Sequence, residues 1–269
     1  MNLPPPDFED PSSAVSAAIH EAPTVQPAPA VLPAAHRARP SPPALSADDL
    51  VSLIKDAATY PWRRDGGMTL VSGALCALVM TAGPFILFGG PFIMVFGAWY
   101  FAAYYFEVIG TTMTGRDSPP DWPSLSNGLD SIFWPGLQML GVALISSLPE
   151  IAIASFTASE EGSFLRLAGA AFAWLYLPMA TLAVVYFGSL SQALPHRVLP
   201  AIRACMPSYL VASGILACSH VVTETIVGLS TGVPLLGSLF AWVITFYTAI
   251  VQARFLGTLH RRHAVDLDW

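Results

Sequence analysis

The sequence MTLVSGALCALVMTAGPFILFGGPFIMVFGAWYFAAYYFEVIGTTM occupies residues 68–113 and contains a single formal charge, Glu107. A run this long and this apolar is typical of membrane-spanning segments. The hydrocarbon core of a bilayer is about 30 Å thick and needs about 20 helical residues per crossing. The run therefore predicts two crossings, and Gly89-Gly90-Pro91 stands where the chain should turn between them.

The composition of the whole chain agrees with a membrane protein. Of its 269 residues, 54% are hydrophobic and 11% are charged, whereas soluble domains carry about 25% charged residues. The formal net charge is −6, and no basic surface indicates a nucleic-acid partner. Cys76, Cys205 and Cys218 are scattered and form no Cys-x-x-Cys pair, so we interpret them as packing residues rather than a disulfide or metal set.

The N-terminal region differs from the rest of the chain. The first 50 residues contain 11 prolines and 11 alanines, a composition that buries too little apolar surface to offset the entropy of ordering. We predict a disordered cytoplasmic tail over residues 1–45. The N-terminus has no basic region followed by an apolar stretch, so we expect no secretory signal peptide, and the first membrane helix should direct insertion.

Two short amphipathic helices are predicted at the membrane interface. The first begins at Ser46, which forms a capping pattern with Asp49, and ends at Pro61. Trp62 and the arginines that follow it fit the headgroup region. The second lies within residues 195–207, which are bracketed by prolines.

The fold class that these features predict is an all-α polytopic membrane protein with six transmembrane helices. The domain covers residues 46–263 and is followed by a C-terminal tail, 264–269. A polar loop is expected over Gly115–Asp130, and residues 260–263 read as a basic tail. The expected spans are about 68–88, 92–113, 132–156, 164–193, 209–229 and 233–258.

The distribution of Lys and Arg predicts the orientation of these spans. One side of the membrane holds only Arg166, and the other holds nine basic residues, which are Lys55, Arg63, Arg64, Arg116, Arg197, Arg203, Arg254, Arg261 and Arg262. Cytoplasmic loops carry the excess of basic residues, so we place both termini in the cytoplasm of a bacterial cell, with the protein in its inner membrane. Aromatic residues near span ends are expected to be interfacial anchors: Trp62, Trp122, Trp134 and Tyr209.

Glu107 and Arg254 are candidates for an intramembrane ion pair. Both are expected near the inner ends of spans that run from outside to inside, and Tyr100-x6-Glu107 matches Tyr247-x6-Arg254 as an internal repeat. The pair could fasten the second span to the sixth. Alternatively, it could couple to protons or ions, or Glu107 could extend to the interface by itself.

A second group of ionisable residues lies near the outer face. Glu150 and Arg166 stand on either side of one short turn and are predicted to pair. His220 and Glu224 are four residues apart and share a helix face, and Glu150 is a candidate third ligand for a metal there. A His–Glu hydrogen bond inside the bundle is the alternative. Because two ligands do not make a metal site, we predict neither metal nor cofactor.

Several short motifs resemble those of a known family. They are Tyr60-Pro61, Pro120-x-Trp122-Pro123, Asn127-Gly128-Leu129, Met206-Pro207-Ser-Tyr209-Leu210 and Tyr247-x3-Val251-x2-Arg254-x-Leu256-Gly257. On them, residues 50–262 resemble an uncharacterised family of bacterial and archaeal multi-pass membrane proteins that is defined only as a domain of unknown function. The resemblance implies an all-helical membrane protein and transfers no catalytic residue.

The sequence favours a non-enzymatic function. No phosphate-binding loop, Gly-x-Ser-x-Gly or dinucleotide motif occurs, and no nucleophile stands with a base, so we predict no catalytic residues. A scaffold or assembly partner of a membrane complex is the first hypothesis. Its partners would be the lipid bilayer and either another membrane protein complex or a second copy of the chain. The alternative is a small-molecule or ion transporter or channel that uses intramembrane Glu, His and Arg residues.

Overall fold

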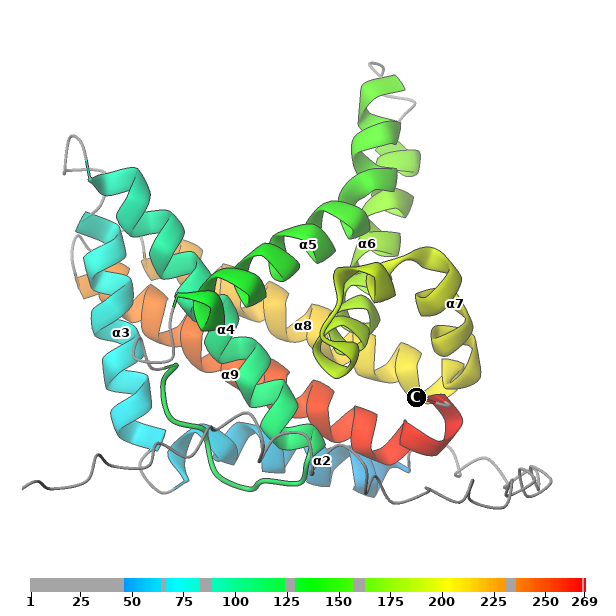
Figure 1. The fold of residues 1–269 in the computed structure, drawn as a ribbon, viewed down its shortest axis with the longest axis horizontal. Helices are drawn as coiled ribbons and strands as arrows, with labels where there is room; N and C mark the ends of the chain where they lie inside the picture. Colours follow the sequence, from blue (N-terminus) through cyan, green and yellow to red (C-terminus); the bar gives the residue numbers. More distant parts are fainter. Residues whose placement is uncertain are drawn as a thin grey trace, which may run out of the picture. The chain divides into compact units, whose positions relative to one another are not determined.

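The computed structural model describes residues 46–63, 66–82, 89–123, 129–156, 163–230, 236–267 and 269. The predicted disordered tail, residues 1–45, lies outside these residues. Every regular element within the described ranges is a helix, and none of these residues forms a strand (Figure 1). The all-helical fold class is therefore confirmed.

The helices follow the predicted order. They are α2 (Ala47–Thr59), η1 (Tyr60–Trp62), α3 (Gly66–Ala82), α4 (Gly90–Met113), α5 (Asp130–Phe156), α6 (Ser163–Phe187), η5 (Leu190–Ala193), α7 (Pro195–Ala204), α8 (Met206–Ser230) and α9 (Leu236–Leu267). Five of these, α4, α5, α6, α8 and α9, are long and apolar enough to cross a membrane. The described part of α3 is apolar but shorter, at 17 residues.

Two predicted boundaries are wrong. The fourth span was expected to reach residue 193, but α6 ends at Phe187 because Gly188 takes a positive φ of 68°, which turns the chain into η5. The chain was expected to leave the helix before its basic residues, but α9 continues to Leu267. Packing explains the extension, since the buried His260 lies against Tyr186, with ring centroids 5.0 Å apart.

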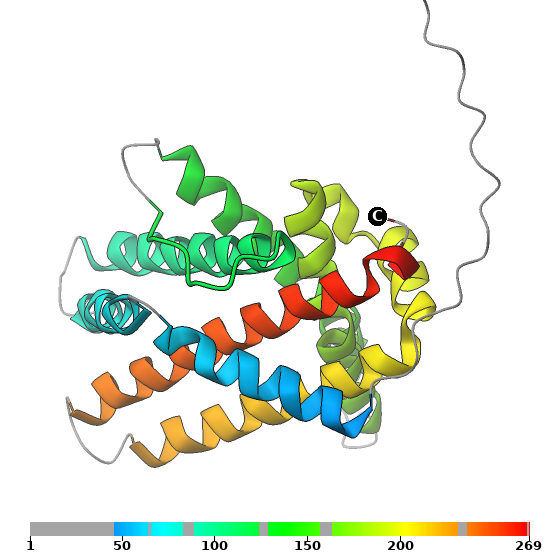
Figure 2. The same cartoon turned by 90° about the horizontal axis from the view of Figure 1, so that it is seen from below.

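The first amphipathic segment forms α2 with the predicted cap. The Ser46 hydroxyl accepts a hydrogen bond from the Asp49 amide at 3.2 Å, and the Asp49 carboxylate accepts one from the Ser46 amide at 3.3 Å. Figure 2 shows α2 alongside α9, with which it is in contact. Arg262 of α9 pairs with Asp49 at 2.9 Å. The first turn of α2 is therefore tied to the last helix, α9.

Helices α4 and α9 approach each other closely at Gly257. A Cβ atom placed on Gly257 would lie 2.5 Å from the Thr112 Cβ and 2.9 Å from the Ile109 carbonyl oxygen. Thr112 and Ile109 are both fully buried there. The two helices that carry Glu107 and Arg254 therefore pack together, and only a residue without a side chain fits at the crossing.

The Tyr209 hydroxyl of α8 forms hydrogen bonds with α6 where the backbone hydrogen-bond ladder of α6 is interrupted. Pro178 lies within α6 and has no N–H to donate, so the helical ladder is broken there. The Tyr209 hydroxyl accepts a hydrogen bond from the Met179 amide at 3.1 Å and donates one to the Leu175 carbonyl at 2.5 Å. Tyr209 is 0% exposed, so its predicted role as an interfacial anchor is wrong, and it joins α6 to α8 instead.

Replacing Tyr209 with phenylalanine is expected to lower the free energy of unfolding by about 1–3 kcal/mol, the cost of leaving buried polar groups unsatisfied. Without the hydroxyl, the Met179 amide and the Leu175 carbonyl lose their shared partner. Thermal unfolding in detergent measures the loss. Tyr186→Phe is the control, because no hydrogen bond from its hydroxyl joins it to another described residue. Equal stability of the two variants would contradict the role given to Tyr209.

Candidate functional site

Arg254 forms the most extensive polar centre among the described residues, but Glu107 is not its partner. The guanidinium is almost wholly buried, with 2% of the residue exposed. Its Nε donates to Asp56 at 3.0 Å, its Nη2 to Asp117 at 2.9 Å and its Nη1 to the Arg116 carbonyl at 2.7 Å. All three nitrogens are used by groups near the ends of helices, so the predicted Glu107–Arg254 pair is wrong.

Aromatic and ionic contacts surround this centre. The Arg254 Cζ lies 4.6 Å from the centroid of the Tyr60 ring, a cation–π arrangement. Burial raises the pKa of Tyr60 above its ordinary value, against the opposing charge of Arg254. Burial also disfavours the ionised form of Asp56, but hydrogen bonds from Arg63 and Arg254 outweigh it and hold the Asp56 pKa below its usual range. The Arg63–Asp56 distance is 2.6 Å.

Residues 116–123, which follow α4, are held in place by hydrogen bonds from α4, α9 and η1. We call these residues the anchored segment. Arg254 binds its first two residues, as described above. Three tyrosine hydroxyls donate to its carbonyl oxygens: Tyr60 to Ser118 at 3.1 Å, Tyr100 to Pro123 at 3.0 Å and Tyr104 to Pro120 at a longer 3.5 Å. Prolines cannot supply backbone N–H donors, so the segment is bound mainly through its carbonyls.

The Trp122 side chain packs the anchored segment against helices α4 and α9. Its ring stacks on Tyr104 of α4 and Phe246 of α9, with centroids 4.5 and 5.5 Å away. The predicted interfacial role of Trp122 is therefore wrong, because the ring packs between helices. Trp62 and Trp134 are 66% and 56% exposed, and their interfacial placement stays a prediction.

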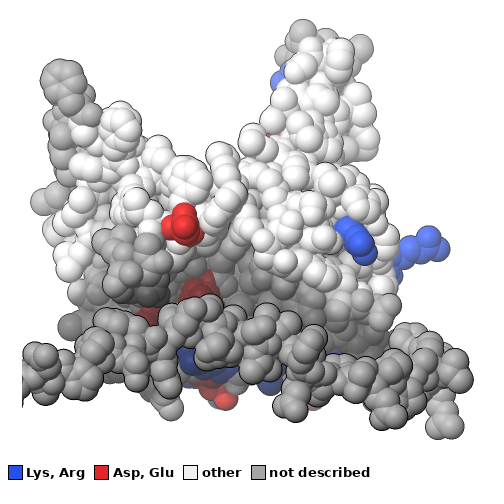
Figure 3. Space-filling view, viewed as in Figure 1, with Lys and Arg blue, Asp and Glu red and all other residues white. Residues whose placement is uncertain are grey.

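A polar cavity of about 570 Å³ lies between the anchored segment and helices α4, α5 and α6. Glu107 is exposed and lines this cavity instead of pairing with Arg254. Arg116 and Asp121 of the anchored segment and Gln138 of α5 also line it. Figure 3 shows acidic side chains near the start of α5 and in the hollow below it, on a face whose upper part has few charges.

The candidate metal ligands named from the sequence do not assemble. His220 and Glu224 share a face of α8, with Nε2 and Oε1 3.9 Å apart, which is too long for a hydrogen bond. The His220 ring packs against Trp174 of α6 at 4.5 Å. In the part of the chain that the structure describes, no group of three or more His, Cys, Asp or Glu could hold a metal ion, so Glu150 does not complete a set with them.

Glu150 and Arg166 lie on adjacent, closely packed helices. The Glu150 Cα is 3.0 Å from the position that a Cβ on Gly169 would take, so α5 and α6 touch there. Gly169 is three residues after Arg166, close to the predicted pair. Whether the two side chains meet stays a prediction.

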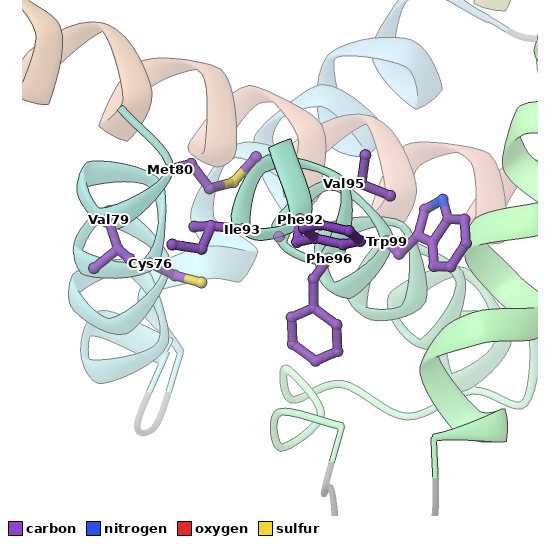
Figure 4. A pocket seen from close by; sticks show the side chains of 9 residues that line it. Cys76, Val79, Met80, Phe92, Ile93, Val95, Phe96 and Trp99 are labelled. Carbon is purple, nitrogen blue, oxygen red and sulfur yellow. The ribbon is translucent and has the colours of Figure 1, made fainter. Parts of the chain in front are cut away.

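A larger pocket between α3 and α4 is apolar. Its volume is about 760 Å³, and Cys76 and Met80 of α3 face Ile93 of α4 beside it (Figure 4). None of the described residues that line this pocket is charged. Apart from the Cys76 thiol and the Trp99 indole, its lining is apolar, so the polar cavity at Glu107 is the better candidate for ligand chemistry.

The fold and these sites define a multi-pass membrane protein, with several helices that can span a bilayer and ionisable groups near their ends. A scan against protein-family models matches no family, and searches of curated proteins and of solved structures find no match. The resemblance to a family of unknown function therefore stays a prediction.

Sequence reasoning missed Asp56 and Asp117 as partners of Arg254. They lie 198 and 137 residues from it along the chain, and neither is part of an apolar span. One signal could have found them: Arg254 lies in an otherwise apolar helix, so a buried carboxylate partner had to come from a segment outside the spans.

Proposed function

We propose that the protein is a non-enzymatic assembly partner of a membrane complex. It would cross a bacterial inner membrane six times, with both termini in the cytoplasm and with α2 and α7 lying at the interface. The apolar segment that begins with α3 would be the first span, and the five long helices would be the other five. The excess of Lys and Arg on one side supports the orientation. Exposed apolar residues on α2, Val51 and Ile54, support its contact with lipid.

The observation that carries the proposal is the outward face of α8. The Glu224 side chain is 63% exposed and that of His220 is 41% exposed, although both belong to a helix long and apolar enough to span a membrane. A charged side chain that faces lipid on a spanning helix is costly, by about 2.5–3.5 kcal/mol at the helix centre and by less toward the helix ends, where Glu224 lies. Contact with another protein would remove this cost, because a partner can supply hydrogen-bond donors.

A neighbouring face of α8 is suited to close helix packing. Gly214 and Cys218 are exposed and one turn apart, and a Cβ placed on Gly214 would meet nothing within 4 Å. Small residues let two membrane helices approach closely. The occupant we propose is a transmembrane helix of a different protein with a basic or hydroxyl side chain opposite Glu224.

Photo-crosslinking in native membranes tests this proposal. A benzophenone amino acid at Val221, which is 63% exposed on α8, should give one discrete adduct with another membrane protein. Leu144 on α5, which is 54% exposed, is the matched control and should give none. Glu224→Leu should abolish the Val221 adduct and the co-purification of the same partner in mild detergent. Adducts with lipid alone, or only with a second copy of the chain, would overturn the proposal.

A second candidate function is a small-molecule or ion transporter or channel. The observation in its favour is that the exposed Glu107 carboxylate lines a cavity of about 570 Å³ within a membrane domain. Flux through proteoliposomes that is lost in Glu107→Gln would support it. Proteoliposomes without flux of protons, ions or small amines would exclude it.

A further inference from the structure

The polar cavity at Glu107 has the size and the charge pattern of a ligand site. Ligand pockets are typically about 300–1,000 Å³, and the cavity measures about 570 Å³. Its charged lining consists of two carboxylates, Glu107 and Asp121, and one guanidinium, Arg116, which leaves one net negative charge. None of the three side chains has an ion-pair partner within 4 Å among the residues that the structure describes.

The wall of this cavity is already ordered. The anchored segment, which contributes Arg116 and Asp121, is tied down by Arg254 and by the tyrosine hydroxyls. On the opposite side, the Gln138 amide donates to the Gly188 carbonyl at 2.8 Å, which joins α5 to the end of α6. The backbone that carries Arg116 and Asp121 is therefore held before a ligand binds, so little affinity would be lost to rearrangement of this wall.

The depth of the cavity suits a lipid headgroup. Glu107 precedes Met113, the last residue of α4, by six residues, a rise of about 9 Å along the helix. Its carboxylate therefore lies close to the helix end, where headgroups meet the hydrocarbon. The lining also includes the apolar residues Phe106, Val184 and Val185. The acyl chain of a lipid could therefore run along them while its polar headgroup is held at Glu107.

We propose that this cavity binds a phosphoethanolamine group. The primary ammonium would be placed at Glu107 and Asp121, and the phosphate at Arg116. An ammonium has three N–H donors and can serve two carboxylates, whereas a quaternary choline has none. An anionic phosphatidylglycerol would bring a second negative charge to a lining that is already negative. The inference goes beyond the assembly role and does not depend on it.

Native mass spectrometry of the full-length protein in detergent tests the site. Dioleoyl phosphatidylethanolamine, phosphatidylcholine and phosphatidylglycerol are titrated separately, and bound lipid is counted. Phosphatidylethanolamine should bind at least about tenfold more tightly than the other two, because loss of one charge-assisted hydrogen bond costs about 1.5–3 kcal/mol. Glu107→Gln and Arg116→Gln should each weaken its binding by about tenfold.

Asp48→Asn, which removes an exposed carboxylate of α2 that does not line the cavity, is the control and should bind like the unmodified protein. Thermal melting checks that the variants fold. If Glu107→Gln or Arg116→Gln does not fold, Asp121→Asn, at an exposed position, takes its place. Competition by free O-phosphoethanolamine would show that the headgroup suffices, and binding of only the lipid would assign the ligand to the membrane. Equal binding of phosphatidylcholine, or unchanged binding by both Glu107→Gln and Arg116→Gln, would overturn the proposal.

Discussion

Replacing Arg254 with methionine is expected to lower the free energy of unfolding by about 3 kcal/mol. Removal of one member of a buried charged network costs about 3–5 kcal/mol, and the lower end applies here because Asp117 is 77% exposed and Asp56 is 31% exposed. Methionine keeps most of the volume, so the loss reports the polar contacts. Denaturant titration of the purified protein in detergent measures it.

The loss of unfolding free energy on removing a partner of Arg254 should be larger for the more buried partner. Asp56→Asn removes a half-buried partner and should cost about 1.5–3 kcal/mol, as expected for a hydrogen bond to a charged group. Asp117→Asn removes an exposed partner and should cost less than about 1 kcal/mol. Arg254→Lys should behave like the methionine variant, since an ammonium cannot reproduce the guanidinium fork. A lysine variant as stable as the unmodified protein would contradict the three-nitrogen arrangement.

Replacing Gly257 with alanine is expected to destabilise the fold by about 1–3 kcal/mol through overpacking. The added methyl would lie 2.5 Å from the Thr112 Cβ and 2.9 Å from the backbone oxygen of Ile109. A backbone atom cannot move aside by a side-chain rotation, so α4 and α9 would have to separate. A lower midpoint of thermal unfolding records the effect.

Gly214→Ala is the matched control for this substitution. Both glycines lie inside apolar helices, but a Cβ at Gly214 meets no atom within 4 Å. Alanine favours a helix over glycine by about 1 kcal/mol, so Gly214→Ala should leave the isolated chain unchanged or slightly more stable. If both substitutions have the same effect, the close crossing of α4 and α9 is not present in solution.

The helical elements were predictable because their signals are local. Apolar length predicts α4 and α5 to within about two residues, and the Ser46–Asp49 pattern predicts the start of α2. Boundaries set by packing were not predictable. The end of α9 depends on a buried His260 and on the Arg262–Asp49 pair, which are contacts between segments far apart in the sequence.

The site was predicted only in part, for the same physical reason. Glu107 and Arg254 were recognised as exceptional because charges are rare in apolar spans. Their partners could not be assigned, since similar depth in a bilayer does not determine which face of a helix a side chain occupies. The aromatic residue Trp122 was misplaced because stacking between helices and anchoring at an interface require the same residue type.

The buried Arg254 is central to the structure, because it joins α2 to α9 and fixes the segment that walls the polar cavity. Hydrogen–deuterium exchange of the unmodified protein and of Arg254→Met, read at peptide level in detergent, tests this most directly. Faster exchange in both α2 and residues 116–123, with α5 and α6 unchanged, is the predicted result. Unchanged exchange in residues 116–123 would contradict the role of Arg254, even if the variant were less stable.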